Sequence, residues 1–497
     1  MLHRRAISAT ILSGRVEEGI RLSEELLKLE PDNALAAFAV AVGRLRDGRL
    51  TQSEALLDNI PTSTLPGVAA QLMRAWILSV KHDTAGASEV LSSLQTIPAV
   101  ADIASLHKAW MKDAAGSPVE AADILQTVLA DQRDVWYRLA ELAGNVYNRA
   151  GRPDAAADIL QRYRATHGFD APILPSVMPQ AGKASSKSLV TGIRDGAAEA
   201  LFDVASLSSR QNQREQALAF GLLGLYLKPD FPALKLVVAE LIESVDRLAD
   251  ANKMYQAIDR TSPLSWVARL AAARNLDALE RFDESEALLR AMAKESPRAP
   301  EPLIQLGDEF RRLERFAEAV QVYDQAAARI GSLDQRHWRL LYARGIALER
   351  TKAWDRAEAD FLRALELEGD QPFVLNYLGY SWVEQGKNLD RAQEMITRAV
   401  ELRPNDGYIV DSLGWVLYRL GRYEGAVETL ERAVELKPED PVINDHLGDA
   451  YWNVGRQREA RFQWRASLAR DPEPELRTSI EKKLSEGLVR EASVIQP

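Results

Sequence analysis

The chain has 497 residues, of which 46% are hydrophobic and 27% charged, and it contains no cysteine. The lack of cysteine excludes disulfides and thiolate metal sites, and the longest apolar run, ALAAFAVAV from Ala34, is too short to cross a bilayer. A net charge of −10 argues against general nucleic-acid binding, which needs a basic surface to displace counterions. We therefore expect the partner to be a protein.

Residues 1–168 are expected to form an N-terminal array of about five helix–turn–helix units. Pro31 closes the first unit, and weaker units centre on Ala55, Ala87 and Ala122. The clearest unit of this part is AELAGNVYNRAGRPDAAADILQRY at 140–163. A periodic pattern of this kind predicts stacked supersecondary units rather than one globular core.

The first residues, MLHRRAISATILSG, combine a basic start with a short apolar stretch, which is also the pattern of a weak signal peptide. Ile7, Ile11, Gly19 and Pro31 nevertheless fall on repeat positions. We therefore expect these residues to belong to a folded unit, and we expect the natural chain to extend further upstream.

A break in the pattern lies at 169–196, where the sequence has three Pro, several Ser and no helical period. This composition predicts a linker or an ordered crossover between two arrays. The stretch QAGKASSKS resembles the end of a phosphate loop, but Val177 stands where that motif needs Gly, and Ala184 follows Lys183. We interpret it as a linker.

Residues 197–472 are expected to form a second array of about eight units with a period of 34. Pro229, Pro263 and Pro297 are evenly spaced by this period, and so are Pro404, Pro438 and Pro472. The clearest units place Gly in the first helix, a small residue in the second helix and a bulky residue four positions later, which is a rule for close helix packing. The strongest markers are Gly379, Gly414 and Gly448, then Ala392, Ala426 and Ala460, with Pro404, Pro438 and Pro472 ending the second helices.

Residues 473–497 are expected to form a helix that caps the last unit, followed by a tail, because a solenoid otherwise ends in an exposed apolar face. A period of 34 with L-G, Y, A-x3-F and P resembles the tetratricopeptide repeat. The resemblance implies an all-α, right-handed superhelical solenoid of about thirteen helix–turn–helix units with a C-terminal capping helix.

Candidate catalytic residues are sparse. Asp411 and Ser412 have no His or Lys placed by a known motif to activate the hydroxyl, and their repeat position explains them as part of a first helix. Among the six His, only His446 has carboxylates at helical spacing, and we interpret it as a solvated or groove-lining residue rather than a metal ligand. We expect no catalytic site, no metal and no cofactor.

In the tetratricopeptide family, positions 2, 5, 9 and 12 of the first helices line a concave groove. The same positions here predict a partner-binding surface made of Asn376, Tyr380, Tyr408, Asp411, Trp415, Asp445, Asp449 and Trp452, with Phe373, Val383, Tyr418 and Val442 completing the pattern. Aromatic and Asn or Asp side chains suit an extended peptide. Asp at position 5 of two consecutive units argues against a carboxylate clamp and favours a neutral or basic peptide. The alternative is that the aromatics only brace adjacent helices.

The C-terminal part of the chain, from about Glu368 onward, resembles the corresponding part of bacterial outer-membrane repeat lipoproteins that act as adaptors for a periplasmic carboxyl-terminal processing protease and its cell-wall hydrolase substrates. The resemblance implies a non-enzymatic scaffold in the periplasm, attached to the outer membrane if an upstream lipoprotein signal exists. This chain has no Cys for acylation. The alternative is a cytoplasmic assembly or regulatory module that binds a peptide segment of its partner.

Overall fold

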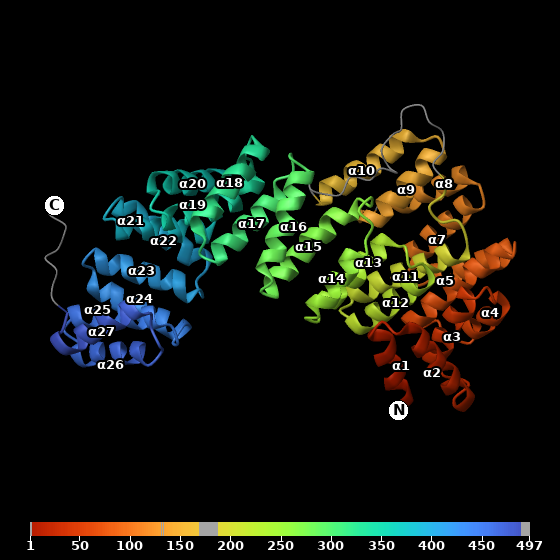
Figure 1. Ribbon diagram of the computed structural model, residues 1–497, viewed down its shortest axis with the longest axis horizontal. Coiled ribbons are helices and arrows are strands. Elements are labelled where there is room, and N and C mark those ends of the chain that lie inside the picture. Colours follow the sequence, from red (N-terminus) through yellow and green to blue (C-terminus); the bar gives the residue numbers. More distant parts are fainter. Residues whose placement is uncertain (1, 131, 133, 168–186, 489–497) are drawn as a thin grey trace. The chain divides into compact units, whose positions relative to one another are not determined.

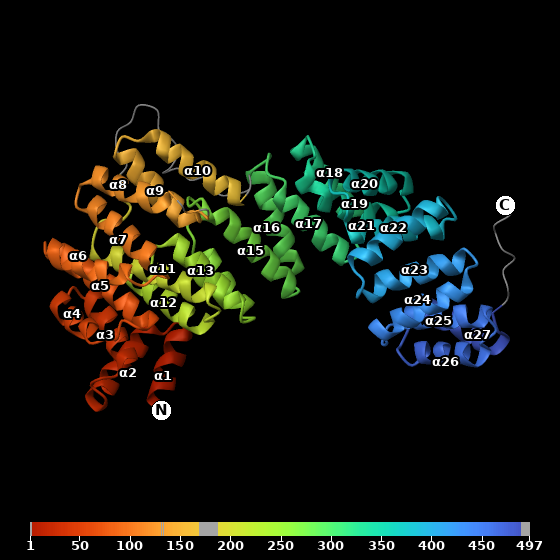
Figure 2. The same ribbon diagram turned by 180° about the vertical axis from the view of Figure 1, so that it is seen from behind.

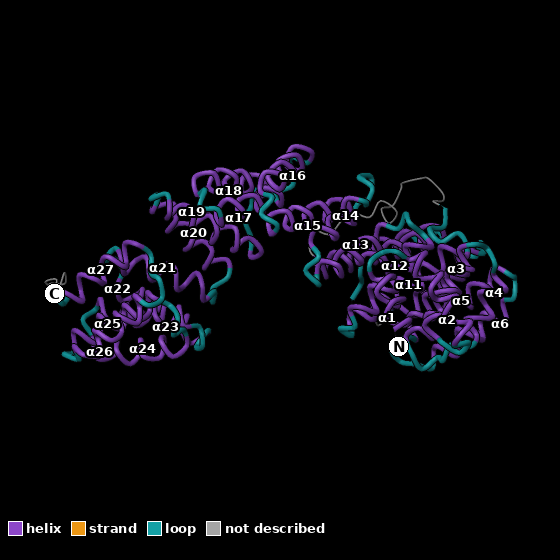
Figure 3. The backbone as a smooth tube through the Cα atoms, turned by 60° about the horizontal axis from the view of Figure 1, so that its bottom comes forward, coloured by secondary structure: helices purple, strands orange, loops and turns teal. Residues whose placement is uncertain are grey.

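The protein is described by a computed structural model that covers residues 2–130, 132, 134–167 and 187–488. Within these residues every regular element is a helix, as Figure 3 shows. The helices pair as hairpins along the whole described chain, and thirteen pairs are followed by one last helix, α27 (Pro474–Glu486). The predicted fold class and the predicted number of units are therefore confirmed.

The chain divides into two compact units, Met1–Leu288 and Leu289–Pro497. The helices of unit 1 are α1 (Leu2–Leu12), α2 (Val16–Leu29), α3 (Ala34–Arg46), α4 (Leu50–Asp58), α5 (Leu65–Val80), α6 (Thr84–Gln95), α7 (Ala101–Ala114), α8 (Pro118–Leu129), α9 (Tyr137–Arg149), α10 (Pro153–His167), α11 (Ile193–Arg210), α12 (Arg214–Leu227), α13 (Pro232–Glu243), α14 (Leu248–Gln256) and α15 (Leu264–Ala278). The boundary between the units falls inside α16 (Phe282–Glu295).

The helices of unit 2 are α17 (Glu301–Arg312), α18 (Phe316–Ile330), the 3-10 turn η1 (Gln335–His337), α19 (Trp338–Arg350), α20 (Trp354–Leu367), α21 (Pro372–Glu384), α22 (Leu389–Leu402), α23 (Gly407–Arg419), α24 (Tyr423–Leu436), α25 (Pro441–Asn453) and α26 (Gln457–Leu468). Several first helices begin with a side-chain N-cap or with a Pro in the first turn. Asp440, for example, accepts hydrogen bonds from the backbone N–H groups of Val442 and Ile443, while Pro441 occupies the first helical turn.

The turn inside every described hairpin contains a residue with a left-handed backbone, and the turn between α21 and α22 contains a second one, Asn388. Glycine adopts this conformation without steric cost, and it fills the slot in seven of these thirteen turns, Gly421 being one example. The other six turns hold a residue with a side chain, such as His82 or Lys352, at the same point of the repeat. The repeat geometry therefore overrides local residue preference.

The glycines inside the first helices of unit 2 lie directly against the bulky residues of the second helices. A Cβ added to Gly414 would be 2.5 Å from Leu430, and one added to Gly448 would be 2.4 Å from Trp464. The small residues Ala426 and Ala460 are fully buried at the same contacts. This small-against-large packing holds each hairpin together.

Unit 1 contains a feature that a simple repeat array lacks. Helices α11 and α12 pack on α1, α3 and α5, and α11 also packs on α7, although they are distant in sequence (Figures 1 and 2). A Cβ on Gly196 would be 2.1 Å from the Trp76 ring, so only glycine allows this close approach of α11 to α5. The buried carboxylate of Glu199 pairs with the buried guanidinium of Arg138 on α9. The sixth hairpin is thus part of the core of the first five.

The predicted linker at 169–196 lies mostly outside the described residues, and its last residues form the start of α11. The boundaries predicted at 168/169 and 196/197 therefore stay predictions. The predicted capping segment contains α27, which packs on α26 and buries Ile480 completely.

Candidate functional site

The predicted groove residues come from α21, α23 and α25, the first helices of three consecutive hairpins. In the structure α23 lies beside both α21 and α25. The residues at position 2 of these helices are all exposed, with exposed fractions of 41% for Phe373, 53% for Tyr408 and 42% for Val442. Large apolar side chains at equivalent positions of neighbouring helices therefore remain open to solvent.

Asp411, on α23, is buried and serves as the partner of a histidine. Its two carboxylate oxygens lie 3.0 and 3.1 Å from Nδ1 of His446 on α25. Burial alone would lower the pKa of His446, but the charge of Asp411 and the carboxylates near it on α25 raise that pKa above its ordinary value. The adjacent Ser412 donates its hydroxyl to the backbone carbonyl of Tyr408 at 3.0 Å. Asp411 and Ser412 therefore contribute to packing and helix structure, not to a nucleophilic pair.

Trp415 braces the same two helices. Its ring stacks on Tyr418, with a centroid distance of 4.8 Å, and on His446, with a centroid distance of 4.1 Å. Its indole Nε1 donates a hydrogen bond to Glu384 at 2.7 Å. The side chain is partly exposed, but its contacts are those of a residue that fixes the spacing of α23 and α25.

Asp445 and Asp449, both on α25, are buried under the capping helix. Nζ of Lys483 on α27 lies 2.7 Å from a carboxylate oxygen of each. Burial and the charge of Asp445 raise the pKa of Asp449 to about 6, although Lys483 and a hydrogen bond from Trp464 act against this. The groove at the last repeat is thus filled by the chain's own lysine.

The remaining predicted residues also have structural surroundings. Trp452 packs on Trp464 at a centroid distance of 5.3 Å. Tyr380 is half-buried, and burial raises its pKa. Asn376 has a buried Oδ1 that accepts no hydrogen bond within the part of the chain that the structure describes. Of the eight predicted residues, Tyr408 alone is strongly exposed.

The expectation of a neutral or basic peptide depended on free carboxylates at position 5 of the first helices. Those carboxylates, Asp411 and Asp445, are paired with His446 and Lys483. A cation faces the exposed rings instead: the guanidinium of Arg403 lies 5.3 Å from the Phe373 ring, and the ammonium of Lys437 lies 5.2 Å from the Tyr408 ring.

Sequence reasoning missed Lys483 and the pairing it makes. The signal in the sequence was a lysine on the predicted capping helix, together with two Asp spaced by four residues on α25, the first helix of the last hairpin. A second omission concerns α13 and α15, whose groove positions also line a pocket. These helices carry Ala239 and Ala273 where the marker glycine stands elsewhere, so the glycine marker does not point to them.

Paired helices of fixed length, with first helices that present side chains to one face, define a helical repeat scaffold. Residues 304–372 match the family described as Tetratricopeptide repeat, and residues 414–455 match that described as TPR repeat. The chain thus contains tetratricopeptide repeats at these residues, and proteins built from such repeats are generally non-catalytic scaffolds that bind proteins or peptides.

Three solved structures are examples of proteins with a similar arrangement of helices. A chain of the APC/C hetero-tetramer Cut9–Hcn1 is 15% identical, with 98% of this chain and 96% of that chain covered and a TM-score of 0.43. YrrB, a TPR protein with an unusual peptide-binding site, is 19% identical over 39% of this chain and 97% of its own, with a TM-score of 0.31. A tetratricopeptide repeat protein from Parabacteroides merdae is 14% identical over 51% of this chain and 97% of its own, with a TM-score of 0.40.

No curated protein matches the chain. A search of the described helices for a stretch with the length and hydropathy of a membrane span finds none.

Proposed function

We propose that the protein is a non-enzymatic interaction scaffold that binds an extended segment of a partner protein along unit 2. The observation that carries this proposal is the row of exposed apolar side chains formed by Phe373, Tyr408 and Val442, which we call the groove rim. Packing of the hairpins does not require large apolar groups at these positions. Exposed aromatic groups with defined neighbours are typical anchors for partner residues.

The surroundings of Tyr408 support a binding role. A cavity of about 510 Å³ opens beside its ring and is also lined by Arg403 and Lys437. Apolar side chains of a peptide would contact the rings, while carbonyl or carboxylate oxygens would accept hydrogen bonds from the two cations. This combination favours a peptide that carries apolar residues together with acidic or neutral ones.

The finer proposal follows from the resemblance of the C-terminal part of the chain to bacterial adaptor lipoproteins. In that proposal the scaffold presents cell-wall hydrolases to a periplasmic carboxyl-terminal processing protease and is associated with the outer membrane. The competing proposal is a cytoplasmic module that assembles or regulates a different partner.

The test uses three full-length baits in a pull-down from a bacterial envelope extract and from a cytosolic extract. They are the wild type, a rim variant with Phe373→Ser, Tyr408→Ser and Val442→Ser, and a control with Phe462→Ser. Phe462 is 68% exposed on α26, a second helix, so the control removes a comparable exposed ring outside the rim. A thermal melt first shows that each bait is folded.

We expect the wild type and the control to recover the same partner and the rim variant to lose most of it. Removing one anchor side chain typically costs about 2 kcal/mol or more of binding. Equal recovery by the rim variant would refute the rim as the binding surface. Recovery of a processing protease and a hydrolase from the envelope extract would support the adaptor proposal, whereas a partner found only in the cytosolic extract would support the competing one.

A further inference from the structure

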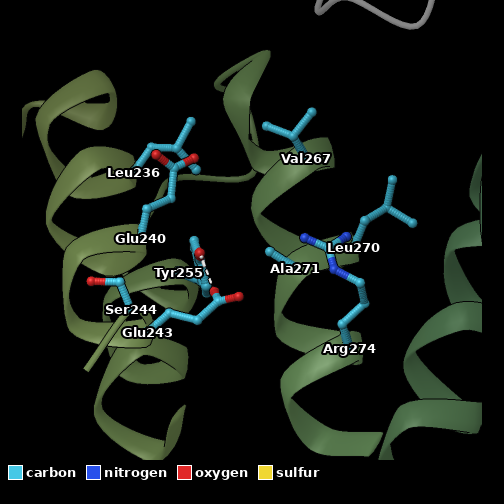
Figure 4. Close-up of a pocket in the computed structure, with 9 residues that line it drawn as sticks. All are labelled: Leu236, Glu240, Glu243, Ser244, Tyr255, Val267, Leu270, Ala271 and Arg274. Carbon is cyan, nitrogen blue, oxygen red and sulfur yellow. Dashed lines mark hydrogen bonds between the residues drawn. The ribbon is translucent and has the colours of Figure 1, made fainter. Parts of the chain in front are cut away.

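A second pocket lies in unit 1, between α13 and α15, and is shown in Figure 4. Its volume of about 550 Å³ falls within the range of small-ligand sites. Leu236 and Glu240 line it from α13, while Val267, Leu270 and Arg274 line it from α15. The walls are thus partly aliphatic, and α13 contributes the two carboxylates Glu240 and Glu243 while α15 contributes the guanidinium of Arg274.

The lining residues occupy groove positions of the repeat. When α13 and α25 are aligned on Ala239 and Gly448, Glu240 stands at position 9, where α25 has Asp449. Arg274 stands at position 9 of α15 in the same register. The pocket therefore opens on the face that the family uses for partners, in a repeat pair separate from the groove rim.

The chain itself shows what an acidic residue at position 9 can hold. Asp449, together with Asp445, receives the ammonium group of Lys483, whose side chain crosses from the capping helix into the groove. Lys483 is largely buried there. A lysine side chain that enters from another helix is therefore a ligand for which this groove position has an example in the same molecule.

The corresponding carboxylate of α13 has no such cation. Within the described part of the chain, Glu240 forms neither a hydrogen bond nor an ion pair, and the same holds for Arg274 across the pocket. Glu243 differs because it accepts hydrogen bonds from Tyr255 at 2.6 Å and from Asn275 at 3.3 Å.

The electrostatic environment of Glu240 favours the arrival of a cation. Glu240 is exposed to solvent on one side, but desolvation by the surrounding pocket walls and the charge of Glu243 raise its pKa, whereas Arg274 lowers it. The two carboxylates and one guanidinium give the pocket a net charge of about −1 when all are ionised. A cationic group placed between the carboxylates would remove the repulsion between them.

We propose that this pocket binds a lysine or arginine side chain of a partner protein, with its aliphatic part between Leu236 and Leu270 and its charged head on Glu240. Arg274 then donates hydrogen bonds to main-chain carbonyl groups of the same segment. The long aliphatic stem of a basic side chain suits the apolar walls, while its head replaces the missing counter-ion. This site is independent of the groove rim and adds a second point of attachment to the scaffold.

The test begins with a random linear peptide library displayed on phage and selected on the full-length wild-type protein. The affinity of the most enriched peptide is then measured by fluorescence anisotropy for the wild type, for Glu240→Gln, for the rim variant and for Glu428→Gln. Glu428 is an exposed residue of α24, so its substitution changes the net charge of the protein equally. A peptide with norleucine in place of its basic residue serves as the ligand control.

We expect enriched peptides to contain Lys or Arg. Glu240→Gln and the norleucine peptide should each weaken binding at least about ten-fold, the loss typical of a charged hydrogen-bond partner. Glu428→Gln and the rim variant should bind as the wild type does. Glu240→Gln should melt like the wild type, because its carboxylate has no hydrogen bond or ion pair to lose within the described residues.

Enriched peptides without basic residues would overturn the inference, as would equal affinity for the wild type and Glu240→Gln. Equal losses in Glu240→Gln and Glu428→Gln would assign the effect to net charge and would overturn it too. Loss of binding in the rim variant alone would refute the pocket as the binding site and remain consistent with the proposed function. Loss of binding in Glu240→Gln alone would support the pocket independently of the rim.

Discussion

Substitution of Lys483 by Met tests whether the capping helix is held by its ion pairs. Methionine keeps most of the aliphatic stem and removes the charge, which leaves Asp445 and Asp449 without a counter-ion. Both carboxylates have side-chain exposures of only 6%, and Lys483 has 14%, so solvent compensates little. Breaking a buried ion pair from one side typically costs about 3–5 kcal/mol.

Hydrogen exchange of the α27 amides measures this cost locally. A loss of about 3 kcal/mol should speed exchange through opening of α27 by about a hundred-fold or more. The control is Lys482→Met, because Lys482 is the exposed neighbour on the same helix. It should exchange as the wild type does.

The deficit should also depend on pH. The folded-state pKa of Asp449, about 6, lies above its ordinary value of 3.8, so its protonated form favours folding and its ionisation costs stability as pH rises through about 6. Lys483 lowers that pKa, and its removal therefore raises it further. The difference between the variant and the wild type in the hydrogen-exchange protection of α27 should therefore be smaller at about pH 5 than at about pH 8. Wild-type protection of α27 at about pH 8, or an equal deficit at both pH values, would refute this reasoning.

Four further substitutions test the helix packing and one buried ion pair. Gly414→Ala should lower stability by about 1–3 kcal/mol, because its new Cβ would be 2.5 Å from a carbon of the second helix, whereas Gly425→Ala, with no contact closer than 3.7 Å, should raise it by up to about 1 kcal/mol in a chemical denaturation series. Ala426→Glu should be severe, since it adds volume and an unpaired charge to a fully buried contact; a melt like that of the wild type would show that the repeat register is wrong. Glu199→Gln should destabilise unit 1 by up to about 3 kcal/mol, because the buried guanidinium of Arg138 loses one carboxylate partner and keeps Glu141. Thermal melting measures the loss, with the exposed Glu215→Gln as a control.

The regular period of the repeat predicts most of the fold because each hairpin makes the same contacts with its neighbours. The Gly, Ala and Pro markers place the helix pairs, and the groove register places Phe373, Tyr408 and Val442 on one face. Side-chain partners in the candidate site were not predictable in the same way. Whether Asp411 is free or paired depends on His446, which lies 35 residues further along the chain and follows no repeat rule.

Contacts that break the repeat pattern were the hardest to predict from the sequence. To predict that Lys483 inserts between two carboxylates, one would need to know how α27 is oriented relative to α25. The packing of α11 on α5 follows a segment without helical period at 169–196, so the register offers no guide to it. Its only sequence trace is Gly196, a small residue at a close helix contact.

The return of α11 and α12 onto the first five hairpins changes how this array can be made and modified. In an ordinary repeat array each unit can fold once its neighbour exists, and units can be gained or lost with little consequence. Trp76 can contact His107, and Arg138 can pair with Glu141, as soon as the first five hairpins exist. Their contacts with Gly196 and Glu199 form only after α11 has left the ribosome. Contacts over such sequence separations slow folding. Duplication or deletion of a hairpin before α10 would shift every contact with α11, so the first part of the chain is fixed in length while the later repeats remain free to vary.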